Sequence, residues 1–344
     1  YTQIANPLVP GNLNYLLDKN HLVVDNNPNS PYQGNVYSAW TDFGQHQANL
    51  PIVFARSTDN GINWIDVQNI SAVTPNEFTQ GVNLQVGPDG ILYATWAIAQ
   101  WNYPRTERAI GFNRSTDGGH TWRGPERVLT VQGIRGRLKN SQIGVNGFPT
   151  MAVDPVSGAI YIVWTQRGLA PAGNDPDVLL IKSVDGGYTW SSPQRVNNDP
   201  LNNGKDQWFP WVTVDPSTGG VYIVFYDSRN STNNQQAEVF LAYSCNGGSN
   251  FGQVNLSDAP FTPVPIVGLR YGYQGDYIGV TALFNTVWAC WADNRTGIYQ
   301  GYVARATFQT LPMPATNWEN IRTLSISGGT TAYSDGYGQH LVGK

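Results

Sequence analysis

Short apolar runs recur along the chain, and each is bounded by glycine, proline, asparagine or aspartate. The clearest runs are VYSAW from Val36, LYATW from Leu92, IYIVW from Ile160, VYIVF from Val221 and VWACW from Val287. Apolar residues on both faces of such a run are typical of a strand that is covered on both sides. Because no segment shows a convincing amphipathic helical period, the pattern predicts an all-β chain.

Further strand signals surround each of these runs. An earlier strand ends in a tight turn, as in TMAVDPVSG from Thr150 and WVTVDPSTG from Trp211, and a third and a fourth strand follow. Four short antiparallel strands per unit form the blade of a β-propeller. We therefore expect one propeller domain over residues 1–344, with clear blades at about 20–75, 80–131, 146–198, 206–258 and 268–325. We expect six blades, the sixth completed by the two termini, and five blades are the alternative.

An octapeptide marks the turn between the third and fourth strands. It reads STDNGINW from Ser57, STDGGHTW from Ser115 and SVDGGYTW from Ser183, with a degenerate copy SCNGGSNF from Ser244. The acid can accept hydrogen bonds from turn amides, the glycines allow positive φ, and the indole can pack between sheets. We therefore expect structural roles for Asp59, Asp117, Asp185, Trp64, Trp122 and Trp190.

This octapeptide resembles the Asp-box, or bacterial neuraminidase repeat, of the sialidase superfamily of β-propellers. The resemblance covers about residues 20–308 and implies a propeller whose catalytic face lies opposite the Asp-boxes. The first blade departs from true sialidases, which carry an F/Y-R-I-P motif where this chain has LLDKNHLVVD, Leu16 to Asp25. The resemblance therefore implies the superfamily fold without the arginine triad of a true sialidase.

The loops on the face opposite the octapeptides carry carboxylates, arginines and aromatic rings, as loop-borne sites on a rigid scaffold often do. Glycoside cleavage needs two carboxylates about 5 to 10 Å apart. As acid and base groups we expect Asp206, Asp276 and Glu77, at least one of them with a raised pKa. As substrate-binding residues we expect Arg270, Tyr271, Tyr273, Tyr277, Trp208, Arg229, Arg295, Asp227, Asp293 and Trp101.

Two of these segments, FYDSR from Phe225 and WADNR from Trp291, share an Asp-x-Arg ending. Side chains two residues apart on a strand face the same way, so each Asp can pair with its Arg. Ion pairing within the protein and contact with substrate both remain open for these residues.

The net charge and the composition argue against nucleic-acid, membrane and metal partners. The formal net charge is −4, and no Lys/Arg run supplies the basic surface that nucleic-acid binding requires. No apolar run approaches the roughly 18 residues of a membrane span. Cys245 and Cys290 lack metal-ligand spacing, so we expect free thiols and no metal site. No cofactor is expected, with Ca²⁺ in an Asp- and Asn-rich loop as the alternative.

These observations predict a monomeric protein, secreted or at the cell surface, that acts on an oligo- or polysaccharide. A glycoside hydrolase or lyase is the first hypothesis. A noncatalytic glycan-binding or adhesion propeller is the alternative, and an exo-sialidase ranks third.

Overall fold

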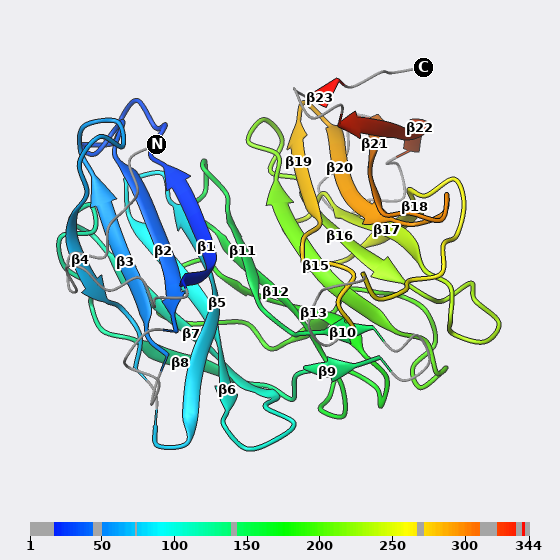
Figure 1. Ribbon diagram of the computed structural model, residues 1–344. Coiled ribbons are helices and arrows are strands. Elements are labelled where there is room, and N and C mark those ends of the chain that lie inside the picture. Colours follow the sequence, from blue (N-terminus) through cyan, green and yellow to red (C-terminus); the bar gives the residue numbers. More distant parts are fainter. Residues whose placement is uncertain are drawn as a thin grey trace. The chain divides into compact units, whose positions relative to one another are not determined.

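The computed structural model describes residues 17–43, 50–72, 74–138, 143–266, 272–309, 322–334 and 339–340. These residues form 23 strands, and no helix among them is long and apolar enough to cross a membrane. The strands build six sheets: four of four strands and one of five, which have the size of propeller blades, and one short sheet of two strands (Figure 1). The closing blade predicted from the termini falls largely on residues outside the described part, and stays a prediction.

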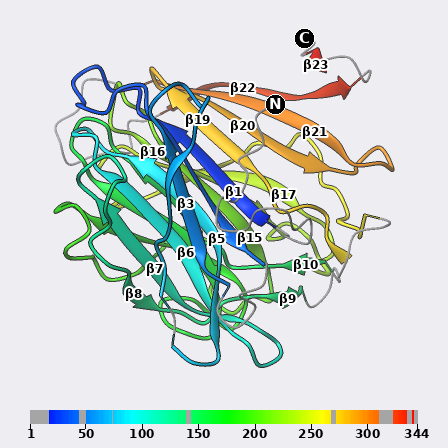
Figure 2. The same cartoon turned by 60° about the vertical axis from the view of Figure 1, so that its left-hand side comes forward.

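The chain divides into two compact units, the first comprising residues 1–132, 148–160 and 184–190. One of its sheets has the order β1-β2-β3-β4 and consists of Leu17–Val24, Val36–Asp42, Ile52–Ser57 and Ile65–Asn69. The next has the order β5-β6-β7-β8, side by side in Figure 2, and consists of Glu77–Val86, Leu92–Gln100, Glu107–Ser115 and Glu126–Thr130. Strand β11 spans Thr150–Val153.

The second unit comprises residues 133–147, 161–183 and 191–344. The sheet β11-β12-β13-β14 continues from β11 with Ile160–Gln166, Asp177–Ser183 and Gln194–Arg195. The sheet β15-β16-β17-β18 consists of Gln207–Val214, Val221–Asp227, Glu238–Ser244 and Gly252–Asn255. The five-stranded sheet β19 to β23 consists of Gly279–Leu283, Thr286–Asp293, Gln300–Gln309, Arg322–Ser334 and Gln339–His340. The short pair β9 and β10 consists of Gly136–Arg137 and Gly144–Val145.

The octapeptide turns are closed by their own side chains. The Asp117 carboxylate accepts hydrogen bonds from the Ser115 hydroxyl at 2.8 Å and from the Thr121 amide and hydroxyl at 2.8 and 2.5 Å. In the degenerate copy the Asn246 side-chain oxygen accepts the matching bond from the Ser244 hydroxyl at 2.8 Å. Matching bonds reach the other two acids, from Asn63 to Asp59 and from Thr189 to Asp185. A side-chain oxygen, charged or neutral, therefore suffices to hold the turn.

Each of three turns is also held by the preceding sheet, through a basic side chain on that sheet's third strand. These donors bind the carbonyl oxygen of the first octapeptide glycine, in the pairs Arg56 to Gly118 at 3.2 Å, Arg114 to Gly186 at 2.6 Å and Lys182 to Gly247 at 3.1 Å. Every donor directly precedes the first serine of its own octapeptide. The repeat thus encodes both the donor and the acceptor of a contact between sheets.

Aromatic packing reinforces this contact. The Trp122 ring meets Phe54 of the preceding sheet edge-on at 5.0 Å, and Trp190 meets Phe112 in the same way at 5.1 Å. The second glycine must remain small, because a Cβ at Gly119 would lie 2.6 Å from the Phe54 ring and its φ is 84°. The octapeptide therefore joins a hairpin to its neighbouring sheet.

Among the described residues, one face of the five-stranded sheet is less covered than the matching faces of the other sheets. The tyrosines that follow the first residue of the apolar run are buried in the other sheets, with exposed fractions of 0% for Tyr37, 3% for Tyr93, 2% for Tyr161 and 4% for Tyr222. Trp288 occupies the same position in the last run, and its side chain is 39% exposed. This is the face that the expected closing blade would cover.

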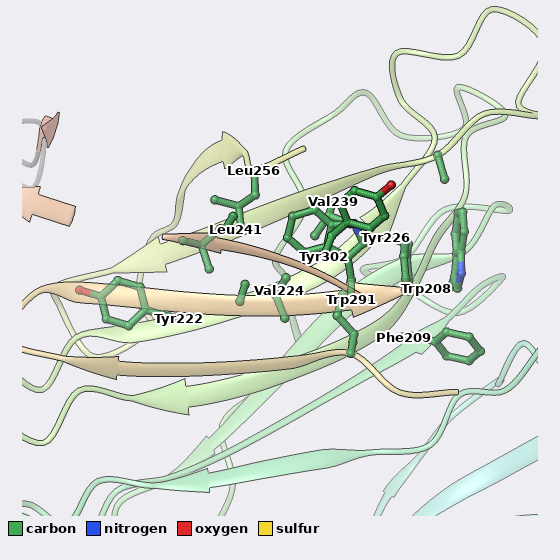
Figure 3. Packing of buried hydrophobic residues seen from close by; sticks show 14 of the residues in the cluster. Trp208, Phe209, Tyr222, Val224, Tyr226, Val239, Leu241, Leu256, Trp291 and Tyr302 are labelled. Carbon is green, nitrogen blue, oxygen red and sulfur yellow. The ribbon is translucent and has the colours of Figure 1, made fainter. Parts of the chain in front are cut away.

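The core of the second unit is built from stacked aromatic rings. Trp208 stacks on Tyr226 at 5.5 Å, and Trp291 stacks on Tyr302 at 6.2 Å (Figure 3). The Tyr226 hydroxyl donates to the Ala292 carbonyl at 2.9 Å and so ties β16 to β20. Trp208, expected as a substrate-binding platform, is only 1% exposed, so its ring serves this core.

We predict that Arg114→Met lowers the free energy of unfolding by about 1–2 kcal/mol, because it removes the bond to the Gly186 carbonyl and the guanidinium that stacks 3.3 Å from the Tyr188 ring. Urea unfolding measures the change. The control Arg108→Met alters an exposed arginine on the same strand and should cost less than about 0.5 kcal/mol. Equal effects of the two substitutions would contradict the proposed contact.

Candidate functional site

The distal end of each sheet, defined as the end opposite its octapeptide turn, carries the residues expected to form a site. Near this end the first strands of three sheets contain a β-bulge, between Asp18 and His21, Gln80 and Asn83, and Trp208 and Trp211. Each bulge holds one residue at positive φ, namely Lys19 at 53°, Gly81 at 76° and Phe209 at 51°. Such a conformation is strained for residues that carry a Cβ, and bulges commonly redirect side chains near functional sites.

Asp276 and Asp206 lie in the second unit and are held by neutral amides. The Asn146 side chain donates to Asp276 Oδ1 at 3.0 Å, and Asp276 remains partly exposed. Asn234 donates to Asp206 Oδ2 at 2.8 Å, and the Asp206 backbone N–H donates to the Ser228 hydroxyl at 2.7 Å. Asp206 is only 5% exposed, so Asp276 is the more accessible of the two carboxylates.

Glu77, the third expected acid or base, begins β5 in the first unit. Arg127 Nη2 donates to both of its carboxylate oxygens at 2.7 and 2.6 Å, and the Thr74 hydroxyl donates at 2.6 Å. Partial burial works to raise the pKa of Glu77, but the bonds from Arg127 and Thr74 outweigh it and hold the pKa below its ordinary value. Glu77 is therefore ionised at neutral pH.

The pair Asp227 and Arg229 is formed within the protein. Arg229 Nε and Nη2 donate to Asp227 Oδ2 at 2.8 and 2.6 Å, Arg229 Nη1 donates to Asn198 at 2.8 Å, and the guanidinium lies 4.2 Å from the Phe240 ring. Asp227 is completely buried, and burial raises its pKa against the opposing effect of Arg229. Each of the three guanidinium nitrogens of Arg229 is thus bound to a protein group.

Asp293 and Arg295 repeat the arrangement. Arg295 Nε and Nη2 donate to Asp293 Oδ2 at 2.9 and 2.6 Å, and Nη1 pairs with Asp258. Trp291 Nε1 also donates to Asp293 Oδ2, at 3.1 Å, and the guanidinium lies 4.3 Å from the Tyr302 ring. The intramolecular pairing that the Asp-x-Arg spacing allowed is present in both segments, while a role in substrate contact stays a prediction.

A buried polar network beside Asp227 was missed from the sequence. Asn197 Nδ2 lies 2.7 Å from both Asp177 Oδ1 and Asp199 Oδ1, so these carboxylate oxygens are at most twice that distance apart. Arg195 binds the same two oxygens at 2.6 and 3.0 Å. Gln207 Nε2 reaches both Asp199 and Asp227, at 3.3 and 3.1 Å, and so links the network to the Arg229 pair. Arg195, Asn197 and Asp199 lie close together in one segment, but their partners Asp177 and Gln207 come from β13 and β15, so no local motif marks the network.

The expected aromatic residues differ in exposure. Tyr277 beside Asp276 is 62% exposed, and Tyr273 is partly buried. Trp101, after β6, is partly buried against Phe78 at 4.8 Å, with the Arg105 guanidinium 5.3 Å from its ring. Tyr277 and the partly exposed Trp101 therefore present ring surface at the distal ends of their sheets.

Two expected substrate-binding residues, Arg270 and Tyr271, lie outside the described residues. Among those that the structure describes, no group of three or more His, Cys, Asp and Glu side chains could hold a metal ion. Both cysteines are exposed free thiols. The described part of the site therefore consists of carboxylates, amides, aromatic rings and the two arginines that pair with Asp227 and Asp293.

No family model matches the chain. Among curated proteins it is 26% identical over 181 residues to a sialidase of Bacteroides fragilis, a match that covers 47% of this chain and 32% of that protein. The chain thus spans about a third of the length of that relative.

Solved structures share the fold at low identity. A protein of unknown function from Dyadobacter fermentans is 17% identical with a TM-score of 0.54, covering 92% of this chain and 85% of its own. A GH93 α-L-arabinofuranosidase of Fusarium graminearum is 11% identical with a TM-score of 0.52, covering 91% of this chain and 93% of its own. The chain shares the β-propeller fold of these proteins, and together with the sialidase match this supports the sialidase-like superfamily.

We predict that Arg229→Met costs about 3–5 kcal/mol of unfolding free energy, because it leaves the Asp227 carboxylate buried without its ion-pair partner. The double variant Asp227→Asn with Arg229→Met removes both charges and should recover at least half of that loss. Chemical denaturation measures both values. A double variant no more stable than Arg229→Met would contradict the structural pairing.

Proposed function

We propose that the protein acts on a carbohydrate at the distal ends of its sheets, as a glycoside hydrolase or lyase. The named relatives support this class, since one is a sialidase and another is an α-L-arabinofuranosidase solved with arabinobiose. The observation that carries the proposal is the partly exposed Asp276 carboxylate, which is held by the neutral Asn146 amide and is followed in the chain by Tyr277, an exposed aromatic residue. Enzymes that cleave sugars use carboxylates for the reaction and aromatic rings as platforms for the sugar.

The three expected carboxylates suit different steps. Glu77 is ionised at neutral pH, which fits a general base or a nucleophile. Asp276 is accessible enough to exchange a proton with a leaving group or a water molecule. Asp206 is more deeply buried, and its bonds to Asn234 and Ser228 give it a fixed position. We assign Asp276 to the reacting centre and keep Asp206, in the same unit, as its candidate partner; Glu77, in the first unit, stays a predicted acid or base.

A noncatalytic glycan-binding propeller is the second candidate. The exposed rings of Tyr277 and of Tyr103, which is 94% exposed, would serve a lectin as well as an enzyme. An exo-sialidase is disfavoured, because the guanidinium groups of Arg229 and Arg295 are bound to Asp227, Asp293 and Asp258 and are not free to clasp a substrate carboxylate.

Assay of the protein against a panel of aryl glycosides and polysaccharides tests the proposal. We expect product release by the wild-type protein and a loss of at least about 100-fold in kcat/KM for Asp276→Asn. Asp89→Asn is the matched control, since Asp89 is an exposed acid in the turn between β5 and β6, at the octapeptide end of the sheet. Sugar binding on a glycan array without turnover would favour the lectin. The absence of both binding and turnover would overturn the proposal.

A further inference from the structure

The loop at residues 101–106 joins β6 to β7 at the distal end of their sheet, and hydrogen bonds hold its backbone. The Trp101 N–H donates to the Asn76 carbonyl, in the segment before β5, at 2.8 Å. Within the loop, the Arg105 N–H donates to the Asn102 carbonyl at 2.8 Å and closes a tight turn. The turn and the bond to the neighbouring segment therefore give the side chains of this loop defined starting points.

Arg105 adopts a backbone conformation that its residue type does not favour. Its φ is 61°, in the left-handed region where glycine is common and a residue that carries a Cβ is strained. The side chain is exposed, and its guanidinium lies 5.3 Å from the Trp101 ring without a hydrogen bond or an ion pair to any described residue. Strained residues cluster at sites that bind ligands, so this unpaired arginine indicates a ligand contact.

The same turn exposes an aromatic ring. Tyr103 lies two residues before Arg105 and is 94% exposed. A single exposed ring is common on protein surfaces and implies nothing by itself. Together with an unpaired guanidinium it suits an acidic sugar, because an aromatic ring packs on the apolar face of a sugar and arginine forms paired hydrogen bonds to a carboxylate or a sulfate.

The charges around the loop favour an anionic ligand. The carboxylate of Glu77, at the start of β5, is paired with Arg127 at 2.6 Å. Glu107, at the start of β7, is 1% exposed and has its partner within the protein. The next residue, Arg108, is exposed and has no carboxylate partner among the described residues. Arg105 and Arg108 thus add positive charge that would attract a ligand carboxylate or sulfate.

We infer that residues 101–106 form a binding position for an acidic saccharide, in which the Tyr103 ring packs on a sugar and Arg105 binds its carboxylate or sulfate group. This position lies in the first unit and involves no residue of the second. The inference rests on the proposed function for the class of its ligand, since an acidic peptide could use the same ring and guanidinium. It goes beyond that function by naming a binding position apart from the reacting centre and the charge of its ligand.

A structural role for Arg105 makes a different prediction from ligand binding. If the contact with Trp101 stabilises the loop, Arg105→Gly lowers the Tm. If Arg105 serves a ligand, Arg105→Gly relieves the strained φ and leaves the Tm unchanged or higher, while binding weakens. At the aromatic position, Tyr103→Ala removes the ring, whereas Tyr103→Phe keeps it and should bind like the wild-type protein.

Calorimetry at low ionic strength measures Kd for a galacturonic acid tetramer, a sulfated galactose tetramer and a neutral galactose tetramer. We expect at least one acidic tetramer to bind about tenfold more tightly than the neutral one, because it alone meets Arg105 with an anionic group. Tyr103→Ala and Arg105→Gly should each weaken this binding about tenfold without lowering the Tm. The control Arg123→Gln removes an exposed arginine beside the octapeptide of the same sheet and should bind like the wild-type protein.

Several outcomes would overturn the inference. It fails if no tetramer binds, or if the neutral tetramer or a glutamate peptide of equal charge binds as tightly as the acidic tetramers. It also fails if Tyr103→Ala and Arg105→Gly bind like the wild-type protein, or if Arg105→Gly lowers the Tm with an unchanged Kd. Turnover and its loss in Asp276→Asn test the proposed function separately, so that function can stand when this inference fails.

Discussion

The contact between an octapeptide turn and the preceding sheet is the constraint on which the rest of the fold depends. One turn must close its own hairpin through Asp117 or its equivalent, and must also offer a glycine carbonyl and an indole to the neighbouring sheet. Arg56, Arg114 and Lys182 complete the contact from the other side. Because donor and acceptor lie within one short repeat, each blade that carries the repeat can bind the octapeptide turn of the next blade.

Because the octapeptide ends of the sheets make the contacts between neighbouring sheets, the distal ends are left for the functional residues. The octapeptide acids accept hydrogen bonds from turn amides and hydroxyls, so their carboxylates serve to hold the turns. At the distal ends, the buried network of Asp177, Arg195 and Asp199 fixes the loops around Asp227. Rigid loops of this kind can hold a site in a defined geometry.

The sequence predicted those features that repeat. The apolar runs mark the second strands because they are covered on both sides, and the octapeptide marks the turns because its chemistry is local. The same reasoning recognised that Asp227 can pair with Arg229, because side chains two residues apart in an extended segment face the same way. Fold class was therefore accessible from the chain alone.

Features that depend on register were not accessible. The bulges at Lys19 and Phe209 cannot be read from their residue types, because glycine is the usual residue at positive φ. The burial of Trp208 likewise depends on Tyr226, which comes from the next strand. Expected contacts of Arg270 and Tyr271 stay predictions, since neither lies in the described part of the chain.

The separation of a structural end from a functional end is tested most directly by hydrogen exchange, measured with and without a saturating oligosaccharide. We expect the bound sugar to slow exchange in residues 272–278, which hold Asp276, and to leave residues 115–122 and 183–190 unchanged. Protection of the octapeptide segments, with none around Asp276, would contradict the account.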